Sequence, residues 1–473
     1  MSFFKKHNKK NYLIIGLGRS GFWAAKLLQN LGNKVLVIDE SNNSELSNSQ
    51  KLLEKDGVKV ILDKPFLYDE ISPYLPNLNY VILSPTISLA NDTVKKLRKQ
   101  KIILLGEIDI GWQYLKNINW VGITGTNGKT TVTDLLSHIL SENHLIAPAA
   151  GNIGIPICKY AYDLYKDKKN IDWLITELSS YQIEITDELK PKIGIWTTFT
   201  SDHLERHKNL ENYFNIKNKL LKNSQIRIYN YDDKNLRNSS QKLSKGIWVT
   251  SSSDSLTRKN CDYWIDKEGY VNEKGKKLFD TKFFNLKGEH NLQNLLLASA
   301  AARKIGLTGD NISNALLNYR NLPHRLETIF KNRKFEIIND SKATNFDSSL
   351  VGINSIKKSK IIISGGRKKE GDYKTWAKTI FQKCNSIFLF GESAYELESL
   401  LNKEDFKIRI YCFKNLSDLI DKVLIHAKRE KVNTILFSPA CSSFDQFKNY
   451  EERGNYFKFL VNEAITKNKT LLD

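Results

Sequence analysis

The sequence predicts an α/β protein of three domains, each built on a mainly parallel β-sheet. Three observations lead to this prediction. The chain has 473 residues, enough for several domains of ordinary size. Short apolar, β-branched runs alternate along it with segments whose apolar residues recur at helical spacing. Two glycine-bearing turns, near residues 16 and 125, each join such a run directly to such a segment. The predicted domains are 1–110, 111–321 and 322–473.

Composition narrows the class of protein. The hydrophobic content is 41%, and no apolar run approaches the roughly 20 residues of a membrane-spanning helix. The basic N-terminus leads into a strand pattern, so no signal peptide is expected. Five cysteines without CxxC spacing are typical of a reducing compartment. The formal net charge of +20 comes from lysines spread along the whole chain, which indicates compositional bias rather than a nucleic-acid partner. We expect a cytoplasmic monomer with no membrane insertion.

The first domain opens with a dinucleotide-type fingerprint. A strand over 12–15 meets Gly16-Leu17-Gly18-Arg19-Ser20-Gly21, then a helix and a second strand that ends at Asp39. Such a loop binds a diphosphate next to a ribose, which several nucleotides carry. The pattern predicts a Rossmann-like domain, with further strands at 58–62, 80–83 and 102–104, without fixing the nucleotide.

The second domain carries a phosphate-binding loop. A strand over 120–124 enters a turn with Gly125 and Gly128, and Lys129-Thr130 then begins an apolar helix. Backbone N–H groups, the helix N-terminus and the lysine favour an anion, and the threonine hydroxyl can hold Mg²⁺. The strict nucleotide-loop pattern has a glycine where Ile123 stands. The loop is therefore a variant, and it predicts a central ATPase-type domain that binds a triphosphate.

Polar residues follow later strands of this domain. Glu177 lies in a predicted strand over 173–180, and Asp202-His203 follows the run that begins at 193. Ligands bind at the carboxyl ends of parallel strands, where a carboxylate suits Mg²⁺. Short strands are expected at 246–250 and 263–265. Asn291 and Asn294 then sit i, i+3 on the first turn of a helix, where they can read an adenine edge, although capping explains one of them equally well.

The third domain is predicted to start after a joint at 321–327. Strand-like runs begin at residues 335, 360, 386, 408 and 433, with helical patterns between them. Clusters of polar or small residues at 339–349, 364–372 and 438–454 follow strand ends. These clusters predict one binding face on a second Rossmann-like sheet.

At the level of motifs the chain resembles the ATP-dependent Mur ligases, which build the peptide of bacterial peptidoglycan. The matching stretches are 124–131 (TGTNGKTT), 151–154 (GNIG), 177–180 (ELSS), 202–203 (DH), 288–291 (GEHN), 323–325 (PHR) and 340–345 (DSKATN). The run at 438–450 and the N-terminal GLGRSG narrow the resemblance to the branch that adds D-glutamate. Folylpolyglutamate synthases share the phosphate loop and parts of the rest.

This resemblance implies a reaction. The γ-phosphoryl group of ATP would pass to the carboxylate of UDP-N-acetylmuramoyl-L-alanine, and the amine of D-glutamate would attack the acyl phosphate. Two Mg²⁺ ions would take part. Thr130 and Glu177 would serve one ion and His203 the second, together with Lys217, which follows Tyr213 with the family's spacing and would be carbamylated. An exposed helical lysine is the alternative interpretation of Lys217, and Lys219 lies nearby.

The resemblance also implies the remaining site residues. ATP would contact Gly125, Thr126, Asn127, Gly128, Lys129, Thr130, Thr131, Asn291, Asn294, His324, Arg325, Asp340 and Lys342. The UDP-linked substrate would contact Arg19, Ser20, Asp39, Ser84, Asn152, Ser179 and Gln182. D-glutamate would contact Thr344, Lys369, Ser443 and Tyr450. Catalysis would rest on Lys129, Glu177, His203, Lys217 and Lys342.

The chain departs from the family pattern in three ways, and several functions compete. Thr86 replaces a glycine, Thr198 stands where asparagine is common, and Arg367 and Lys368 offer cations beside Lys369. An NAD-dependent dehydrogenase would leave the phosphate loop unexplained, and a non-catalytic nucleotide-binding protein would leave the charged strand ends unexplained. A Mur ligase with another amino-acid specificity and a folylpolyglutamate synthase-like ligase are the remaining alternatives, although the latter has no use for a UDP-binding domain.

Overall fold

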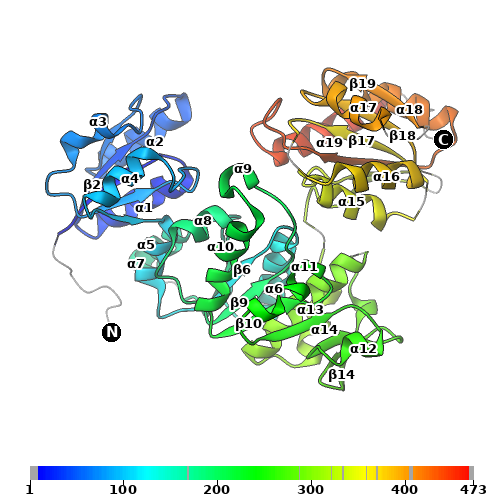
Figure 1. Cartoon of the computed structure of the whole chain (residues 1–473), viewed down its shortest axis with the longest axis horizontal. Coiled ribbons are helices and arrows are strands. Elements are labelled where there is room, and N and C mark those ends of the chain that lie inside the picture. The colour runs from blue at the N-terminus through cyan, green and yellow to red at the C-terminus, as the bar shows by residue number, and fades with distance from the viewer. Residues whose placement is uncertain are drawn as a thin grey trace. The chain divides into compact units, whose positions relative to one another are not determined.

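The computed structural model describes residues 9–167, 170–286, 288–320, 322–332, 335–357, 359–368, 371–403 and 408–467. Three β-sheets organise these residues, which confirms the predicted α/β class (Figure 1). The chain divides into two compact units. The first comprises Met1–Phe199, Leu204–Phe284 and Gln293–Asn318, and the second Thr200–His203, Asn285–Leu292 and Tyr319–Asp473. The first unit holds two of the sheets and the second unit holds the third.

The first sheet is entirely parallel, with strand order β3-β2-β1-β4-β5. Its strands are β1 (Asn11–Ile15), β2 (Lys34–Ile38), β3 (Lys59–Ile61), β4 (Tyr80–Leu83) and β5 (Ile103–Leu105). The helices are α1 (Arg19–Asn30), α2 (Ser44–Lys55), α3 (Tyr68–Ile71), α4 (Asp92–Lys99) and α5 (Glu107–Leu115). This order is that of a Rossmann domain, as the fingerprint predicts. Successive residues of β1 belong to two different apolar clusters, because a doubly wound sheet buries both faces.

The second sheet has nine strands in the order β14-β13-β12-β11-β10-β9-β6-β8-β7. They are β6 (Asn119–Thr124), β7 (Ala149–Gly151), β8 (Trp173–Glu177), β9 (Ile193–Trp196), β10 (Ile226–Asn230), β11 (Ile247–Thr250), β12 (Tyr263–Ile265), β13 (Tyr270–Glu273) and β14 (Lys276–Asp280). The helices are α6 (Lys129–Glu142), α7 (Ile157–Asp167), α8 (Ser180–Ile185), α9 (Leu204–His207), α10 (Leu210–Asn223), α11 (Lys234–Asn238), α12 (Ser255–Arg258), α13 (Glu289–Ile305) and α14 (Gly309–Leu317). Helix α6 buries Val132, Leu135, Leu136, Ile139 and Leu140 at the predicted helical spacing.

Two local features of this sheet differ from the prediction. The strand predicted over 173–180 ends at Glu177, because Ser179 caps the new helix α8. The antiparallel hairpin β13–β14 was not predicted. Its two-residue turn, Lys274-Gly275, has φ values of 47° and 89°, the backbone of a type I′ turn. A lysine at the first turn position is a weaker sequence signal than the asparagine or aspartate usual there.

The third sheet has the order β15-β16-β20-β17-β18-β19, and β15 is antiparallel to β16 while the others are parallel. Its strands are β15 (Glu327–Lys331), β16 (Glu336–Asn339), β17 (Lys360–Gly365), β18 (Cys384–Phe390), β19 (Arg409–Phe413) and β20 (Thr434–Ala440). The helices are α15 (Phe346–Ser355), α16 (Tyr373–Lys383), α17 (Ala394–Asn402), α18 (Ile420–Arg429) and α19 (Tyr450–Lys467). One face packs on α18 and α19 and the other on α15, α16 and α17. The domain boundaries at 110 and 321 stay predictions, and Asn321 itself lies outside the described residues.

Candidate functional site

The phosphate loop (residues 125–131) joins β6 to α6 and needs both of its glycines. Gly125 and Gly128 have φ values of +149° and +82°, where residues with side chains are strained. A Cβ at Gly125 would lie 1.9 Å from Thr197 Oγ1, and one at Gly128 would lie 2.6 Å from Asn294 Oδ1. Substitution at either position therefore strains the backbone and displaces a neighbour.

The segment after β9 holds this loop in shape. The N–H groups of Thr126 and Asn127 donate to the carbonyl and hydroxyl oxygens of Thr198, both at 2.8 Å. The Thr198 hydroxyl in turn lies 3.1 Å from the Asn127 carbonyl oxygen. Thr198 departs from the residue common in the resembling family, yet its hydroxyl reaches both backbone groups of Asn127.

Positive charge gathers at the loop. The Lys129 ammonium donates to the carbonyl oxygens of Gly125, at 3.0 Å, and Thr126, at 2.8 Å. The Lys217 ammonium donates to the same Gly125 carbonyl at 2.8 Å. Thr130, in the first turn of α6, is buried. Two ammonium groups thus meet on one carbonyl oxygen beside the N-terminus of α6, where the helix dipole also favours negative charge.

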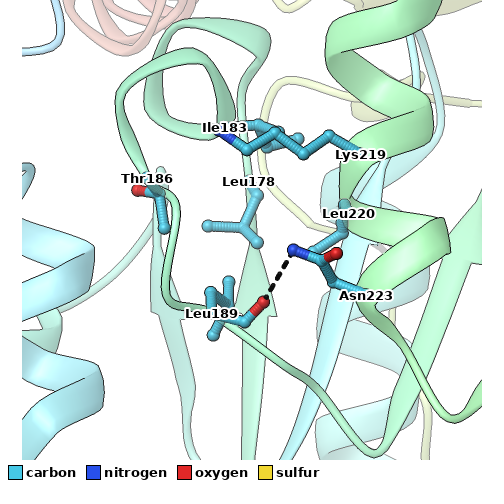
Figure 2. A pocket seen from close by; sticks show the side chains of 7 residues that line it. All are labelled: Leu178, Ile183, Thr186, Leu189, Lys219, Leu220 and Asn223. Carbon is cyan, nitrogen blue, oxygen red and sulfur yellow. Dashed lines mark hydrogen bonds between the residues drawn. The ribbon is translucent and has the colours of Figure 1, made fainter.

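Lys217 is not an exposed helical lysine. Its side chain on α10 is 1% exposed, and its ammonium lies 3.4 Å from Thr124 Oγ1 and 4.6 Å from the centroid of the Tyr213 ring. The nearby Lys219 pairs instead with Asp187. Figure 2 shows Lys219 beside a small, mostly apolar pocket, where Asn223 donates to the Leu189 carbonyl. This pocket is lined by Leu178, Ile183, Thr186, Leu189, Lys219, Leu220 and Asn223. Of the two lysines, Lys217 is the one in contact with the phosphate loop.

Glu177 ends β8 beside the strand that leads into the loop. The Leu178 N–H donates to the Ile123 carbonyl, and the Thr124 hydroxyl donates to the Leu178 carbonyl at 3.0 Å. The Glu177 side chain is 1% exposed and accepts a 2.8 Å hydrogen bond from the Asn152 amide. The structure thus brings together the predicted carboxylate, the predicted phosphate loop and Asn152.

Asp39, the acidic residue of the fingerprint, is hydrogen-bonded to the glycine-bearing loop of the first sheet. Asp39 accepts a 2.6 Å hydrogen bond from the Leu17 N–H through one oxygen and a 2.9 Å bond from Ser41 through the other. A Cβ at Gly21 would lie 2.0 Å from the Gly16 carbonyl oxygen, so the helix packs closely on the loop. Arg19 and Ser20 lie in the first turn of α1.

Three other predicted substrate residues make structural contacts. Ser179 caps α8 by accepting from the Gln182 N–H, and the Gln182 side chain accepts from the Ser179 N–H at 3.0 Å. Ser84, after β4, contacts the Thr86 hydroxyl at 2.9 Å. Asn291 and Asn294 are both buried on α13.

In the second unit, the segments that follow β16 and β20 carry the predicted nucleotide and amino-acid residues. Asp340 is 7% exposed and accepts from the Ser438 hydroxyl at 3.0 Å and the Leu326 N–H at 3.3 Å. Burial raises the pKa of Asp340 to about 7. His324 is buried, with Nδ1 3.0 Å from the Asn339 amide, and burial lowers its pKa. His324 and Leu326 have φ values of 65° and 44°, the strained region that favours glycine.

The predicted lysine and aromatic residue of this face touch. The Lys342 ammonium lies 3.7 Å from the centroid of the Tyr450 ring, a cation–π contact. Ser443 is buried, while Arg325 and Thr344 are half-buried. Lys369 lies outside the described residues, next to the exposed Arg367 and the half-buried Lys368.

Asp202 and His203 also belong to the second unit. The His203 N–H donates to Asp202 Oδ1 at 3.0 Å, and its ring Nε2 lies 3.5 Å from Asp202 Oδ2. His203 has a φ of 57°, so this segment turns sharply at the histidine.

Two arginines at these sites were missed at the sequence level. Arg453 on α19 is fully buried and donates to the carbonyls of Ser341, at 2.7 Å, and Cys441, at 2.9 Å. Burial lowers its pKa to about 10. Arg206 on α9 binds backbone carbonyls after β4. Both lie in polar runs that are typical of exposed helices. The only sequence signal that could have pointed to Arg206 is its position three residues after the predicted site residue His203.

Metal ligands do not cluster in the parts of the chain that the structure describes: no group of three or more His, Cys, Asp and Glu side chains gathers there. Within the same described ranges, no helix is long and apolar enough to cross a membrane.

With this geometry in place, comparison with known proteins decides the family. A UDP-N-acetylmuramoylalanine–D-glutamate ligase of Prochlorococcus marinus (strain MIT 9515) is 57% identical over 461 residues, which are 97% of this chain and 96% of that protein. The chain belongs to this family of Mur ligases. The family model described as "Mur ligase middle domain" matches residues 123–302, which hold the phosphate loop, Glu177 and Lys217.

Solved structures of other Mur ligases share the fold. A UDP-N-acetylmuramate–alanine ligase of Thermotoga maritima superposes with a TM-score of 0.59 at 18% identity, covering 98% of this chain and 100% of that one. A MurF ligase of Thermotoga maritima, solved in complex with ADP, gives 0.56 at 16% identity, covering 92% and 96%.

Proposed function

We propose that this chain joins D-glutamate to UDP-N-acetylmuramoyl-L-alanine while ATP is converted to ADP and phosphate, a step in making the peptidoglycan precursor. The observation that carries this proposal is the phosphate loop, where the Lys129 ammonium lies on the Gly125 and Thr126 carbonyls at the N-terminus of α6. Such a concentration of positive charge suits a triphosphate that must approach a second anion, the substrate carboxylate.

The chemistry needs two steps. The substrate carboxylate attacks the γ-phosphorus, the bond to the β-phosphate oxygen breaks, and ADP leaves behind an acyl phosphate. The D-glutamate amine then attacks the acyl carbon and loses a proton, and phosphate leaves as the amide forms. Lys129 and the N–H groups at the start of α6 hold the phosphates throughout.

The oxygen donors beside the loop fit Mg²⁺. Thr130 and Glu177 offer a hydroxyl and a carboxylate, the hard ligands that this ion prefers, few enough to leave positions for phosphate oxygens and water. When bound, Mg²⁺ neutralises phosphate charge. Lys217 becomes an anionic partner if its amine adds carbon dioxide and releases a proton, since the resulting carbamate would face Lys129. His203 stays the predicted ligand of a second ion.

The other subsites follow from the same assignment. Arg19, Ser20, Asp39 and Ser84 serve the uridine diphosphate. Asn152, Ser179 and Gln182 serve the muramoyl-alanine, and Asn294 beside Gly128 serves the adenine end of ATP with Asn291. In the second unit, His324, Arg325, Asp340 and Lys342 serve ATP, and Thr344, Ser443, Tyr450 and Lys369 serve D-glutamate. We further propose that the protein works as a cytoplasmic monomer.

An ADP-release assay with UDP-N-acetylmuramoyl-L-alanine and a panel of amino acids tests the function. We expect turnover with D-glutamate at least about a hundredfold above that with L-glutamate, L-lysine or diaminopimelate, because unpaired buried polar groups reject the wrong substrate. Lys129→Ala is the matched inactive variant, which should still bind the UDP-linked substrate. Equal turnover with another amino acid would assign the chain to a different specificity.

A further inference from the structure

An arginine outside the assigned subsites connects a loop of the first unit to helix α8. Arg206 lies on α9, and its guanidinium donates to the carbonyls of Thr86 and Ile87, both at 2.8 Å. Its Nε and Nη2 also donate to Glu184 Oε2 on α8, at 3.0 and 2.6 Å. The guanidinium carbon lies 4.7 Å from the centroid of the Tyr181 ring. One planar group is thus bonded to three acceptors and stacked on a fourth partner.

The loop in this arrangement sits on the fingerprint glycines. The Ser84 N–H donates to the Ile15 carbonyl, and a Cβ at Gly16 would lie 3.1 Å from the Ser84 Cβ. The Ser84 and Thr86 hydroxyls are joined at 2.9 Å. Arg206 therefore binds the backbone of the loop that carries Ser84, a residue of the proposed uridine subsite.

The second element carries the proposed muramoyl subsite. Glu184 belongs to α8, the helix whose N-terminal cap is made by Ser179 and Gln182. The Arg206 and Glu184 side chains are only 8% and 17% exposed, so their contact is shielded from solvent. A second hydrogen bond also connects the two proposed subsites: Arg19 donates to the Gly154 carbonyl at 2.6 Å, in the loop that carries Asn152.

We propose that Arg206 and Glu184 form a latch that fixes the spacing between the uridine subsite and the muramoyl-alanine subsite. This inference rests on the proposed function and adds positioning residues to it. The UDP-linked substrate spans both subsites. Once one half of the substrate is bound, the other half is held near its own subsite at a high effective concentration, and this gain requires a fixed spacing between the two subsites. Arginine suits this role because its fork reaches two carbonyls and a carboxylate at once, which a lysine ammonium does not.

The latch predicts a specific pattern of affinities. Calorimetric titration of the full-length protein would compare UDP alone with UDP-N-acetylmuramoyl-L-alanine. In Arg206→Lys, which keeps the charge beside Glu184, we expect the full substrate to bind at least about tenfold more weakly, while UDP changes less than about twofold. Glu184→Gln, which removes the charge and keeps an acceptor, should shift the same ratio in the same direction and by less.

Arg303→Lys is the matched control. Arg303 also donates to a glutamate, Glu273, at 2.9 Å and to a backbone carbonyl, that of Leu307, at 2.6 Å, in the same unit. It should lose stability without changing the ratio of the two affinities. Equal weakening of UDP and of the full substrate in Arg206→Lys would overturn the latch alone. Wild-type protein that binds neither ligand would overturn the proposed function together with it.

Discussion

Lys217 illustrates how burial changes the interpretation of a single side chain. In the sequence it is one of two lysines within three positions of a polar helix. In the structure it is 1% exposed against the phosphate loop, whereas Lys219 pairs with Asp187. Burying an ammonium group is unfavourable unless hydrogen bonds or charges compensate for lost water. A lysine held in such a place therefore points to chemistry rather than to solubility.

The first prediction concerns this lysine. Lys217→Ala should lower turnover by about a hundredfold or more, because the anionic partner of Lys129 is lost from a water-poor site. Bicarbonate together with a short carboxylic acid should restore part of the ADP release by supplying a replacement carboxylate. Lys219→Ala, two positions along the same helix, is the control and should keep nearly full activity. Lost activity that no small carboxylate restores would count against carbamylation.

The shape of the phosphate loop depends on residues far away in the chain. Its two glycines are shaped by Thr197, Thr198 and Asn294, which come from the segment after β9 and from α13. Ile123, which breaks the strict nucleotide-loop pattern, is a fully buried residue of β6. The position is therefore part of the strand, and Gly125 begins the loop proper.

A pair of glycines with the same backbone conformation tests this dependence. Gly128 and Gly32 have φ values of +82° and +83°, but a Cβ at Gly32 would meet no atom within 4 Å. Alanine at either should cost on the order of 1 kcal/mol through backbone strain. Only Gly128→Ala should also raise the KM for ATP, by about tenfold or more, because the methyl group displaces Asn294. Thermal unfolding and ADP-release kinetics measure the two effects. Equal ATP kinetics in both variants would show that the loop tolerates a side chain there.

Buried carboxyl groups make the stability of the folded protein depend on pH. Burial raises the pKa of Glu107 to about 7, that of Asp109 to about 6 and that of Asp340 to about 7. Glu107, at the start of α5, accepts the Cys158 N–H in the first turn of α7 at 2.6 Å, so it joins two helices of the first unit. A carboxyl group with a raised pKa holds its proton more tightly in the folded state than in the unfolded one.

The sign of the pH effect follows from this difference. Between pH 4.5, the ordinary value for Glu107, and about 7, the folded state binds more protons, so the free energy of unfolding falls as pH rises. Glu107→Gln keeps an acceptor for Cys158 and removes the titration. We expect the variant to lose less stability than wild type between pH 5 and pH 8, by on the order of 1–3 kcal/mol. Urea unfolding across that range measures it, with the exposed Glu45→Gln as control. Parallel pH profiles for wild type and Glu107→Gln would contradict the assignment.

The fold class, most strand positions and the family-like motifs could be predicted from the sequence. These are local signals: apolar periodicity, glycines at tight turns and charged residues at strand ends report on backbone geometry within a few residues. The structure confirmed β4 and β12 residue for residue and placed Glu177 at the end of β8.

Roles that depend on contacts between distant parts of the chain could not be predicted and appear in the folded structure alone. It distinguished Lys217 from Lys219, revealed the Arg206 contacts with Thr86 and Ile87, and placed the buried Arg453 against Ser341 and Cys441. The carbonyl partners of Arg206 lie 119 and 120 residues away in sequence, those of Arg453 up to 112. In the sequence both arginines resemble the charged residues of exposed helices. Their burial and hydrogen bonding become apparent only when the fold brings together backbone carbonyl groups from distant segments.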